Sequence, residues 1–313
     1  MDKRTYRCVI WGMGVEYERR LNQVLFEIEK KNIEVIAIVV RKKDRYCKRR
    51  DGFRVIVKEE LLSLEFDYII IHSSRFFKEI KEEGCLLGIA NEKMIDGKVF
   101  ELPLFDFSRY TKLIENPVTI LSDDCWGGYV YNMLGLPFSS PLINTFFYRD
   151  EYARFLKKPL YYLGCELEMV REGSLEGSVC PIGRLGMGED VVTIEFQHVI
   201  SFDRAKEEWD RRIKRLNLQN IFVKNGFSRA EKGHELWLEA FREVPYPKIL
   251  FYYGETDIEE VFRTERLFMQ CRNSGLISSF NYNAMVREES KKAMILDIFK
   301  LLTGESNFAR EEY

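Results

Sequence analysis

The segment Ser122-Asp123-Asp124-Cys125-Trp126-Gly127-Gly128 groups residue types that carry chemistry. It follows the apolar run Val118–Leu121, and an apolar run typical of a helix begins at Tyr129. A carboxylate can serve as a general base. A cysteine at the start of a helix can have a lowered pKa and act as a nucleophile. The other interpretation is that Cys125 is a small buried hydrophobe and that the glycines let helix and strand approach each other.

Further candidates lie in the glycine-rich segment Pro181–Asp190 and near the ends of two predicted strands, where His198 and Lys224 stand. A loop of this kind presents backbone N–H groups to anions, and Arg184 could bind phosphate or carboxylate bidentately. An ordinary hairpin or connecting loop is the alternative. We therefore predict a catalytic group, namely Asp123, Asp124, Cys125 and His198, in which Asp124 or His198 is the general base. We also predict a substrate-binding group, namely Arg184, Gly186 and Lys224.

A separate set of residues near the N-terminus could bind a nucleotide. Gly12-Met13-Gly14 follows a short apolar run and precedes a helical pattern. The two glycines would let the backbone approach a phosphate at the start of the helix. Ser73 ends another predicted strand, and Arg41 could meet a 2′-phosphate. The third glycine of the dinucleotide fingerprint is missing, because Tyr17 holds its position, and no acidic residue ends the second strand. A tight turn without a ligand remains the alternative.

Alternating apolar runs and amphipathic segments position these residues. The first part of the chain predicts a doubly wound parallel sheet with helices on both faces, similar to a Rossmann domain. Its expected strands are Arg7–Trp11, Val35–Val40, Arg54–Val57, Phe66–His72 and Lys98–Leu102. Its expected helices are one with Leu21, Val24, Leu25 and Ile28 on a face, then Lys58–Leu64 and Phe76–Glu83.

The second part predicts another layered α/β unit. We place the domains at 1–107 and 108–313, since Phe105–Asn116 reads as a helix or linker that ends before Pro117. Further strands are expected at Val118–Leu121, Ile143–Tyr148, Glu166–Val170, Val191–Val199, Asn220–Lys224, Lys248–Tyr253 and Leu276–Phe280. Helices are expected at Asp150–Leu156, Phe202–Leu216, Arg229–Glu243, Asp257–Arg272 and Glu288–Leu302.

Composition excludes several classes of protein. The chain has 313 residues with 46% hydrophobic and 31% charged residues, which is typical of a globular protein. A net charge of −2 gives no indication of nucleic-acid binding. Seven cysteines without C-x-x-C spacing indicate neither a zinc site nor a disulfide framework, so we predict no metal and a reducing compartment. No apolar run is long enough for a secretory leader or a membrane span, which favours a cytoplasmic protein.

Two resemblances add to these patterns. Residues 5–105, with Ile10-Trp11-Gly12-Met13-Gly14 and Gly88–Phe100, resemble the Rossmann-like domain of nucleotide-sugar-modifying enzymes and sugar acyltransferases. Residues 116–303 resemble a bacterial family of unknown function that carries a C-W-G-G motif and is often labelled exopolysaccharide biosynthesis protein. The motifs that carry this second resemblance are Ser122–Tyr129, Leu134–Pro141, Pro181–Gly186 and Asn220–Lys224.

The resemblances imply a protein of cell-surface polysaccharide biosynthesis that acts on a nucleotide-linked or phosphorylated sugar. They supply no reaction, so a transferase or sugar-modifying enzyme is one hypothesis. A non-catalytic binding or scaffold protein on an α/β frame is the second, and an NADP-dependent oxidoreductase is the third. The expected partner is a small anionic ligand such as a nucleotide or nucleotide-sugar, with no nucleic acid and no membrane insertion. The sequence leaves the oligomeric state open.

Overall fold

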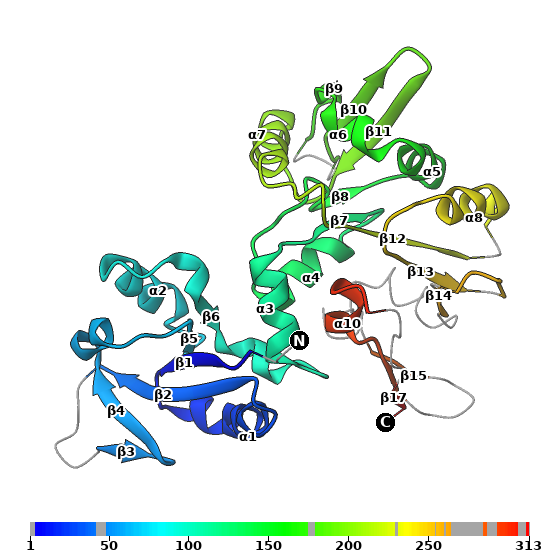
Figure 1. Cartoon of the computed structure of the whole chain (residues 1–313). Helices are drawn as coiled ribbons and strands as arrows, with labels where there is room; N and C mark the ends of the chain where they lie inside the picture. Colours follow the sequence, from blue (N-terminus) through cyan, green and yellow to red (C-terminus); the bar gives the residue numbers. More distant parts are fainter. Residues whose placement is uncertain are drawn as a thin grey trace. The chain divides into compact units, whose positions relative to one another are not determined.

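The chain divides into two compact units, Met1–Glu115 and Asn116–Tyr313. The structure, a computed structural model, describes residues 4–41, 48–174, 179–228, 231–253, 255–259, 261–263, 284–286, 293–305 and 311–312 (Figure 1). We describe each unit by itself. The predicted boundary between residues 107 and 108 stays a prediction.

Unit 1 is a six-stranded sheet with helices on both faces. Its strands are β1 Tyr6–Trp11, β2 Ile33–Val40, β3 Arg49–Arg50, β4 Phe53–Val57, β5 Tyr68–Ile71 and β6 Met94–Asp96. Its helices are α1 Val15–Glu29, α2 Phe77–Leu86 and α3 Phe107–Glu115, with 3-10 turns η1 Lys58–Ser63, η2 Asn91–Lys93 and η3 Gly97–Glu101. Figure 1 shows α1 and α2 on opposite sides of the sheet.

The strand order of this sheet is β3-β4-β2-β1-β5-β6, and all neighbours except β3 and β4 run parallel. Strand β5 is a continuous buried run and β2 is almost wholly apolar, because both faces of a parallel sheet are covered. Along the chain the order moves outward from β1 to β4 and then returns to β5, beside β1. The order therefore reverses between β1 and β5, the place where α/β sheets commonly hold ligands.

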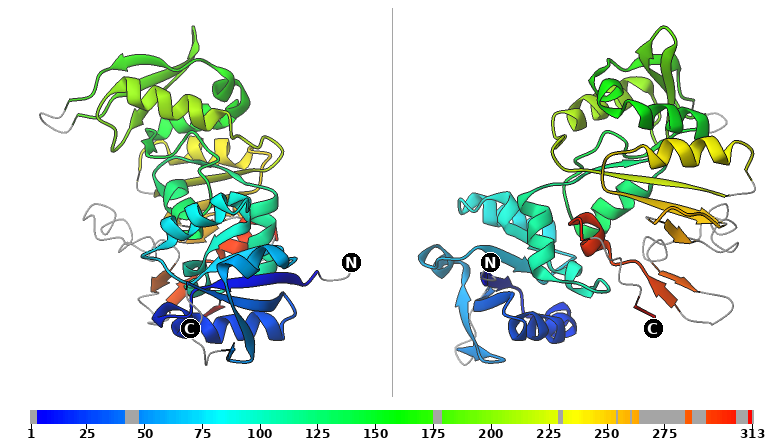
Figure 2. Two further views of the ribbon diagram at one scale, coloured as in Figure 1. Left: turned by 90° about the vertical axis from the view of Figure 1, so that its left-hand side faces the viewer. Right: turned by 45° about the vertical axis from the view of Figure 1, so that its right-hand side comes forward.

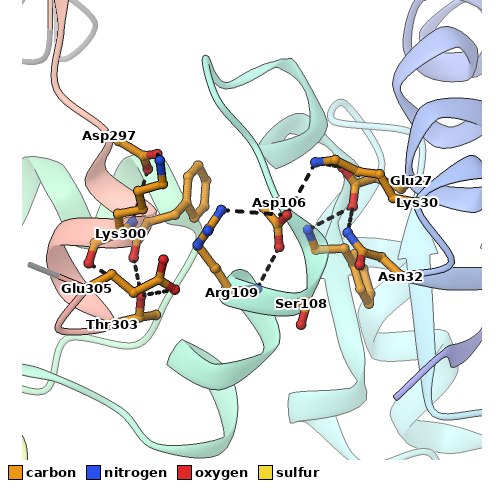
Figure 3. Close-up of polar contacts among 12 residues, drawn as sticks. Glu27, Lys30, Asn32, Asp106, Ser108, Arg109, Asp297, Lys300, Thr303 and Glu305 are labelled. Carbon is orange, nitrogen blue, oxygen red and sulfur yellow. Dashed lines mark hydrogen bonds and ion pairs between the residues drawn. The ribbon is translucent and has the colours of Figure 1, made fainter. Parts of the chain in front are cut away.

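A fully buried carboxylate fixes the start of α3 in unit 1. Glu27, near the end of α1, accepts hydrogen bonds from the side chain of Asn32 and from the backbone N–H of Phe107 at 3.0 Å (Figure 3). Asp106 accepts the N–H of Arg109 at 3.0 Å and pairs with Lys30 at 3.3 Å. These charges replace the partners that the first N–H groups of a helix lack.

Unit 2 contains a parallel sheet, an antiparallel sheet and a small antiparallel sheet. Its strands are β7 Thr119–Ser122, β8 Thr145–Phe146, β9 Glu168–Arg171, β10 Ile182–Met187, β11 Asp190–Phe196, β12 Ile221–Ser228, β13 Lys248–Tyr253, β14 Val261–Arg263, β15 Ala284–Val286, β16 Ala293–Ile295 and β17 Glu311–Glu312. Its helices are α4 Trp126–Leu134, α5 Arg149–Lys157, α6 Pro159–Gly164, α7 Phe202–Ile213, α8 His234–Arg242 and α10 Ile298–Leu302.

The parallel sheet has the order β14-β13-β12-β7 and the antiparallel sheet the order β8-β11-β10-β9. One hydrophobic core joins them, since Leu121 and Val223 of the first sheet and Val192 and Ile194 of the second belong to the same buried cluster. Helix α7 adds Trp209 to this core and lies beside the antiparallel sheet in both views of Figure 2. The α/β fold class is confirmed.

Several predicted elements differ in the structure. The predicted strand Lys98–Leu102 is wrong: the segment is the 3-10 turn η3, because Asp96 accepts the N–H of Lys98 at 3.0 Å and turns the chain. The predicted loop Pro181–Asp190 is wrong, because β10 fills most of it. Gly183 belongs to that strand, where a Cβ atom would lie 2.6 Å from a side-chain carbon of Leu167.

The last predicted elements also differ. The predicted helix Asp257–Arg272 is wrong where the structure describes it, since Val261–Arg263 is strand β14 and pairs with β13. The predicted helix Glu288–Leu302 contains strand β16, and among its described residues the helical part is Ile298–Leu302. The predicted strand Leu276–Phe280 lies outside the described residues. In the described part of the chain, no helix has both the length and the apolar character that a bilayer crossing requires.

Candidate functional site

Three predicted site residues meet at the carboxyl end of β7 and in the middle of β12. These parallel strands pair Ser122 with Lys224. The Nζ atom of Lys224 lies 2.8 Å from Oδ1 of Asp123 and 2.8 Å from Oδ2 of Asp124. The side chains of Lys224 and Asp123 are only 3% and 0% exposed, so this cluster lies inside the protein. Burial of a charge is tolerated here because each ion has an opposite charge at hydrogen-bonding distance.

Helix α5 contributes a second cation to the cluster. Nη1 of Arg149, the first residue of α5, lies 2.6 Å from Oδ2 of Asp123. Its Nε lies 3.4 Å from Oε2 of Glu231. The backbone oxygen of Glu231 in turn lies 3.1 Å from Nδ1 of His234, which begins α8. A continuous series of contacts therefore leads from the buried carboxylate Asp123 to the start of α8.

Tyr152 of helix α5 links the same two strands through its hydroxyl group. Its hydroxyl oxygen lies 2.9 Å from the carbonyl oxygens of both Leu121 and Lys224. Burial, reinforced by the charges of Asp123 and Asp124, raises the pKa of Tyr152 well above its ordinary value. The phenol therefore stays protonated and holds β7 and β12 together as a hydrogen-bond donor.

The Cys125-Trp126-Gly127-Gly128 turn packs the start of α4 against the sheet. Trp126 is fully buried against Phe222 and Phe251. A Cβ atom on Gly127 would lie 3.2 Å from Ile120, and one on Gly128 would lie 3.2 Å from Ile143. Gly127 thus permits close approach of α4 to strand β7, and Gly128 permits close approach of α4 to the turn before β8. Cys125 is partly exposed at the end of the turn, and its nucleophilic role stays a prediction.

The remaining predicted residues of unit 2 lie in the antiparallel sheet. Arg184 is half exposed on β10 and pairs with Glu168 of β9 at 2.6 Å. Gly186 has φ +94°, and a Cβ atom there would lie 1.9 Å from the carbonyl oxygen of Asp190 across the hairpin. His198 is exposed in a turn after β11 with φ 63°, and no contact among the described residues joins it to Asp124. The structure brings Asp123, Asp124 and Lys224 together, with Cys125 next along the chain, but leaves Arg184, Gly186 and His198 outside that group.

The predicted nucleotide-binding residues lie at the carboxyl ends of β1, β2 and β5 in unit 1. Gly12 has φ 107°, and a Cβ atom there would lie 3.2 Å from the backbone oxygen of His72, so the turn requires glycine. Gly14 precedes α1, with open space at its Cβ position. Ser73 is partly buried beside Gly12. Arg41 is exposed and lies 3.8 Å from Glu79.

An open pocket with a volume of about 600 Å³ lies at the carboxyl end of β13. It is lined by His234, Leu238, Arg242, Tyr252, Glu255, Thr256 and Asp257. His234, Leu238 and Arg242 form one stripe of α8, and the last three residues follow β13 directly. The pocket combines two basic side chains, two carboxylates and a hydroxyl. Among the described residues, no group of three or more possible ligands could hold a metal ion.

Sequence reasoning missed Arg149, Glu231 and the pocket residues. Arg149 stands beside Asp150, where we predicted the helix to begin, whereas the helix begins at Arg149. Asp150 instead accepts the indole N–H of Trp237 at 2.7 Å. A signal existed for the pocket, because His234 and Arg242 recur at helical spacing just before the strand Lys248–Tyr253.

Comparison with known proteins places most of unit 2 in one family. Residues 96–266 match a family described as "Domain of unknown function (DUF1919)", and residues 4–95 match one described as "C2185-like, N-terminal". The chain belongs to the DUF1919 family. Its family match includes the buried Asp123 cluster and all residues of the pocket.

A curated relative shares part of this chain. A Haemophilus influenzae protein named "Uncharacterized protein" is 29% identical over 141 residues, which is 45% of this chain. The alignment spans 64% of the length of that relative. The DUF1919 match and this relative support common ancestry, and neither name states a reaction.

Proposed function

We propose that the DUF1919 region binds a phosphorylated or nucleotide-linked sugar and acts in the biosynthesis of cell-surface polysaccharide. The pathway follows from the resemblance of the C-W-G-G segment to proteins labelled exopolysaccharide biosynthesis protein. The binding function rests on one observation, the open pocket of about 600 Å³ at the carboxyl end of β13. Its volume lies in the range of pockets that hold small ligands.

The lining of the pocket supports a ligand that carries both phosphate and hydroxyl groups. Arg242 offers a planar guanidinium, which suits bidentate contact with phosphate, and it now contacts Asp257. His234 lies at the N-terminal end of α8, where the helix dipole favours an anion. Glu255, Asp257 and Thr256 can accept or donate hydrogen bonds to sugar hydroxyl groups. A phosphate would compete with Asp257 for Arg242.

The buried cluster supports the pocket without touching the ligand. Asp123 and Lys224 are sealed from solvent and bonded to each other, so neither is free to bind phosphate. Arg149 links Asp123 to Glu231, and Glu231 contacts His234 through its backbone oxygen. The cluster thus fixes the position at which α8 begins.

A thermal-shift titration tests the proposal with glucose 1-phosphate, UDP-glucose and plain glucose. A ligand that binds only the folded state raises the free energy of unfolding, by about 2.7 kcal/mol at a hundredfold excess over Kd. The melting temperature rises as a result. We expect the two phosphorylated ligands to raise it at millimolar concentration and glucose to raise it far less. Arg242→Gln should abolish the shift. Arg184→Gln, an exposed arginine that also has an acidic partner, is the matched control and should retain it.

Two results would overturn the proposal. The phosphorylated sugars could fail to raise the melting temperature of the wild-type protein. Alternatively, Arg184→Gln could lose the shift while Arg242→Gln keeps it, which would return the substrate-binding role to the antiparallel sheet.

A non-catalytic binding or scaffold protein is the second candidate. It is favoured by the mutual pairing and burial of Asp123, Asp124 and Lys224, which occupy the charged groups that we predicted to contact a ligand. Incubation with UDP-glucose for hours and analysis for released UDP distinguishes the two. Binding without turnover supports the scaffold, whereas release of UDP that requires Arg242 supports the enzyme. An NADP-dependent oxidoreductase has no comparable support, since acidic residues Glu16 and Glu18 occupy the first turn of α1.

A further inference from the structure

A second cavity lies along the seam between helices α5 and α8, which pack side by side in unit 2 (Figure 1). This seam cavity has a volume of about 350 Å³, which is enough for a small ligand. It is separate from the pocket at the end of β13, which uses the stripe of α8 that runs from His234 to Arg242. Leu236, Ala240 and Glu243 line the seam cavity, and helical spacing places them on another face of α8.

The floor of the seam cavity is apolar. Ala153 of α5 and Ala240 of α8 are 8% and 2% exposed, and their small side chains leave room between the two helices. Trp237 is also buried, and its indole N–H donates to Oδ1 of Asp150 at 2.7 Å, which joins the first turns of both helices. Leu236 lines the cavity and is 67% exposed. An apolar chain in the cavity would remove these surfaces from water, which favours its binding.

The two sides of the seam cavity carry opposite charges. Helix α5 contributes Arg154 and Lys157, and α8 contributes Glu239 and Glu243. All four side chains are exposed, and none forms an ion pair across the seam with a residue that the structure describes. Packed helices have axes about 8–10 Å apart. A ligand that meets both sides therefore needs a negative and a positive group at opposite ends of a chain.

We propose that the seam cavity binds a small zwitterion whose carboxylate and ammonium groups stand at the two ends of an apolar chain, as in an ω-amino acid. The carboxylate contacts Arg154 and Lys157. The ammonium group contacts Glu239 and Glu243, and the chain lies on the apolar floor. The site uses a face of α8 that does not line the pocket at the end of β13, so it does not depend on the function proposed for that pocket.

Calorimetric titration of the full chain with four compounds tests this inference. 6-Aminohexanoate carries both charges at the ends of an apolar chain, hexanoate and hexylamine carry one charge each, and glycine carries both without the chain. We expect 6-aminohexanoate to bind at millimolar concentration. The other three should bind about tenfold more weakly or worse, because a lost hydrogen bond to a charged group lowers affinity by about that factor.

Two substitutions assign the ends of the ligand. Lys157→Met should weaken 6-aminohexanoate about tenfold, to the affinity of hexylamine, because the carboxylate loses a partner. Glu243→Gln should weaken it as much, to the affinity of hexanoate. Lys158→Met is the matched control, since Lys158 is the next exposed lysine but pairs with Asp190 and does not line the cavity. This variant should keep the full affinity, and circular dichroism checks that all three variants fold.

Three results would overturn the inference. 6-Aminohexanoate could bind no more tightly than one of the comparison compounds, or Lys158→Met could lose as much affinity as Lys157→Met. The third result concerns another occupant, a second copy of this chain, which sedimentation velocity detects. A dimer that dissociates in the Glu243→Lys variant would assign the seam to a contact between copies instead of a zwitterion.

Discussion

Replacement of Lys224 by methionine isolates the energetic role of the buried cluster. The substitution keeps the length of the side chain but removes the ammonium group that lies 2.8 Å from both Asp123 and Asp124. Asp123 keeps Arg149 at 2.6 Å, and Asp124 keeps hydrogen bonds such as that from the backbone N–H of Trp126 at 2.9 Å. Two buried carboxylates therefore lose the ammonium group that they share.

The expected loss is large because the cluster is dry. Removing one partner of a buried ion pair costs about 3–5 kcal/mol. For a unit of the size of Asn116–Tyr313, each kcal/mol lowers the melting temperature by about 2–4 °C, so Lys224→Met should lower it by about 6–20 °C. Differential scanning calorimetry is the assay, since it resolves the two units if they unfold separately.

A matched lysine tests the part that burial plays. Lys158 lies 2.8 Å from Asp190, the same distance as in the cluster, but the two side chains are 54% and 50% exposed. Exposed ion pairs contribute about 0–1 kcal/mol, so Lys158→Met should change the melting temperature by only a few degrees. Equal losses from Lys224→Met and Lys158→Met would refute the reasoning. Addition of Asp124→Asn to Lys224→Met should recover part of the loss, because it removes one of the two carboxylates that lost the ammonium group.

Two further predictions concern unit 1 and the hairpin. Burial, together with the positive charge of Arg20, lowers the pKa of His72 to about 3. The unfolded chain therefore binds a proton below pH 6.5 that the folded chain does not, and the free energy of unfolding should fall on acidification by up to about 1.4 kcal/mol per pH unit. Urea unfolding between pH 4.5 and 7.5 measures how the free energy of unfolding depends on pH. This dependence should be weaker in the His72→Leu variant; an equal dependence in the variant and the wild-type protein would contradict the role given to His72. Gly186→Ala places a Cβ atom 1.9 Å from the Asp190 carbonyl oxygen at φ +94°, so it should lose about 1–3 kcal/mol in the same assay and leave sugar-phosphate affinity unchanged. Loss of affinity without loss of stability would instead indicate a ligand contact at Gly186.

The sequence predicted those parts of the fold that depend on local patterns. The run Val35–Val40 is wholly apolar because a central parallel strand is covered on both faces, and it forms most of β2. Asp123 and Lys224 were each predicted at the end of a strand, but in two different groups; the pairing of β7 with β12 brings them into one cluster. Arg149 could not be found in this way, because it reaches Asp123 from the first turn of a helix, and helix starts carry no signal of what lies opposite them.

The wrong predictions arose where two different structures can give the same local sequence pattern. The predicted strand Val191–Val199 includes His198, but β11 ends at Phe196 and His198 adopts a left-handed conformation two residues later. The glycines near Arg184 resembled an anion-binding loop, yet Gly183 makes room for Leu167 within a sheet. Glycine spacing alone does not distinguish an approach to a ligand from an approach to another side chain.

Burial separates the residues that hold the fold of unit 2 from those that can meet a ligand. The Asp123-Asp124 pair has the residue types of an acid–base site, but Lys224 lies between the carboxylates and the cluster is largely buried. Its physical effect is to fix strands β7 and β12 and, through Arg149, the start of α8. The polar side chains that line the pocket lie on α8 and just after β13, so their positions depend on these fixed elements. A ligand in the pocket then meets His234 at a position that the buried charges have already set, so binding requires little reorganisation of α8.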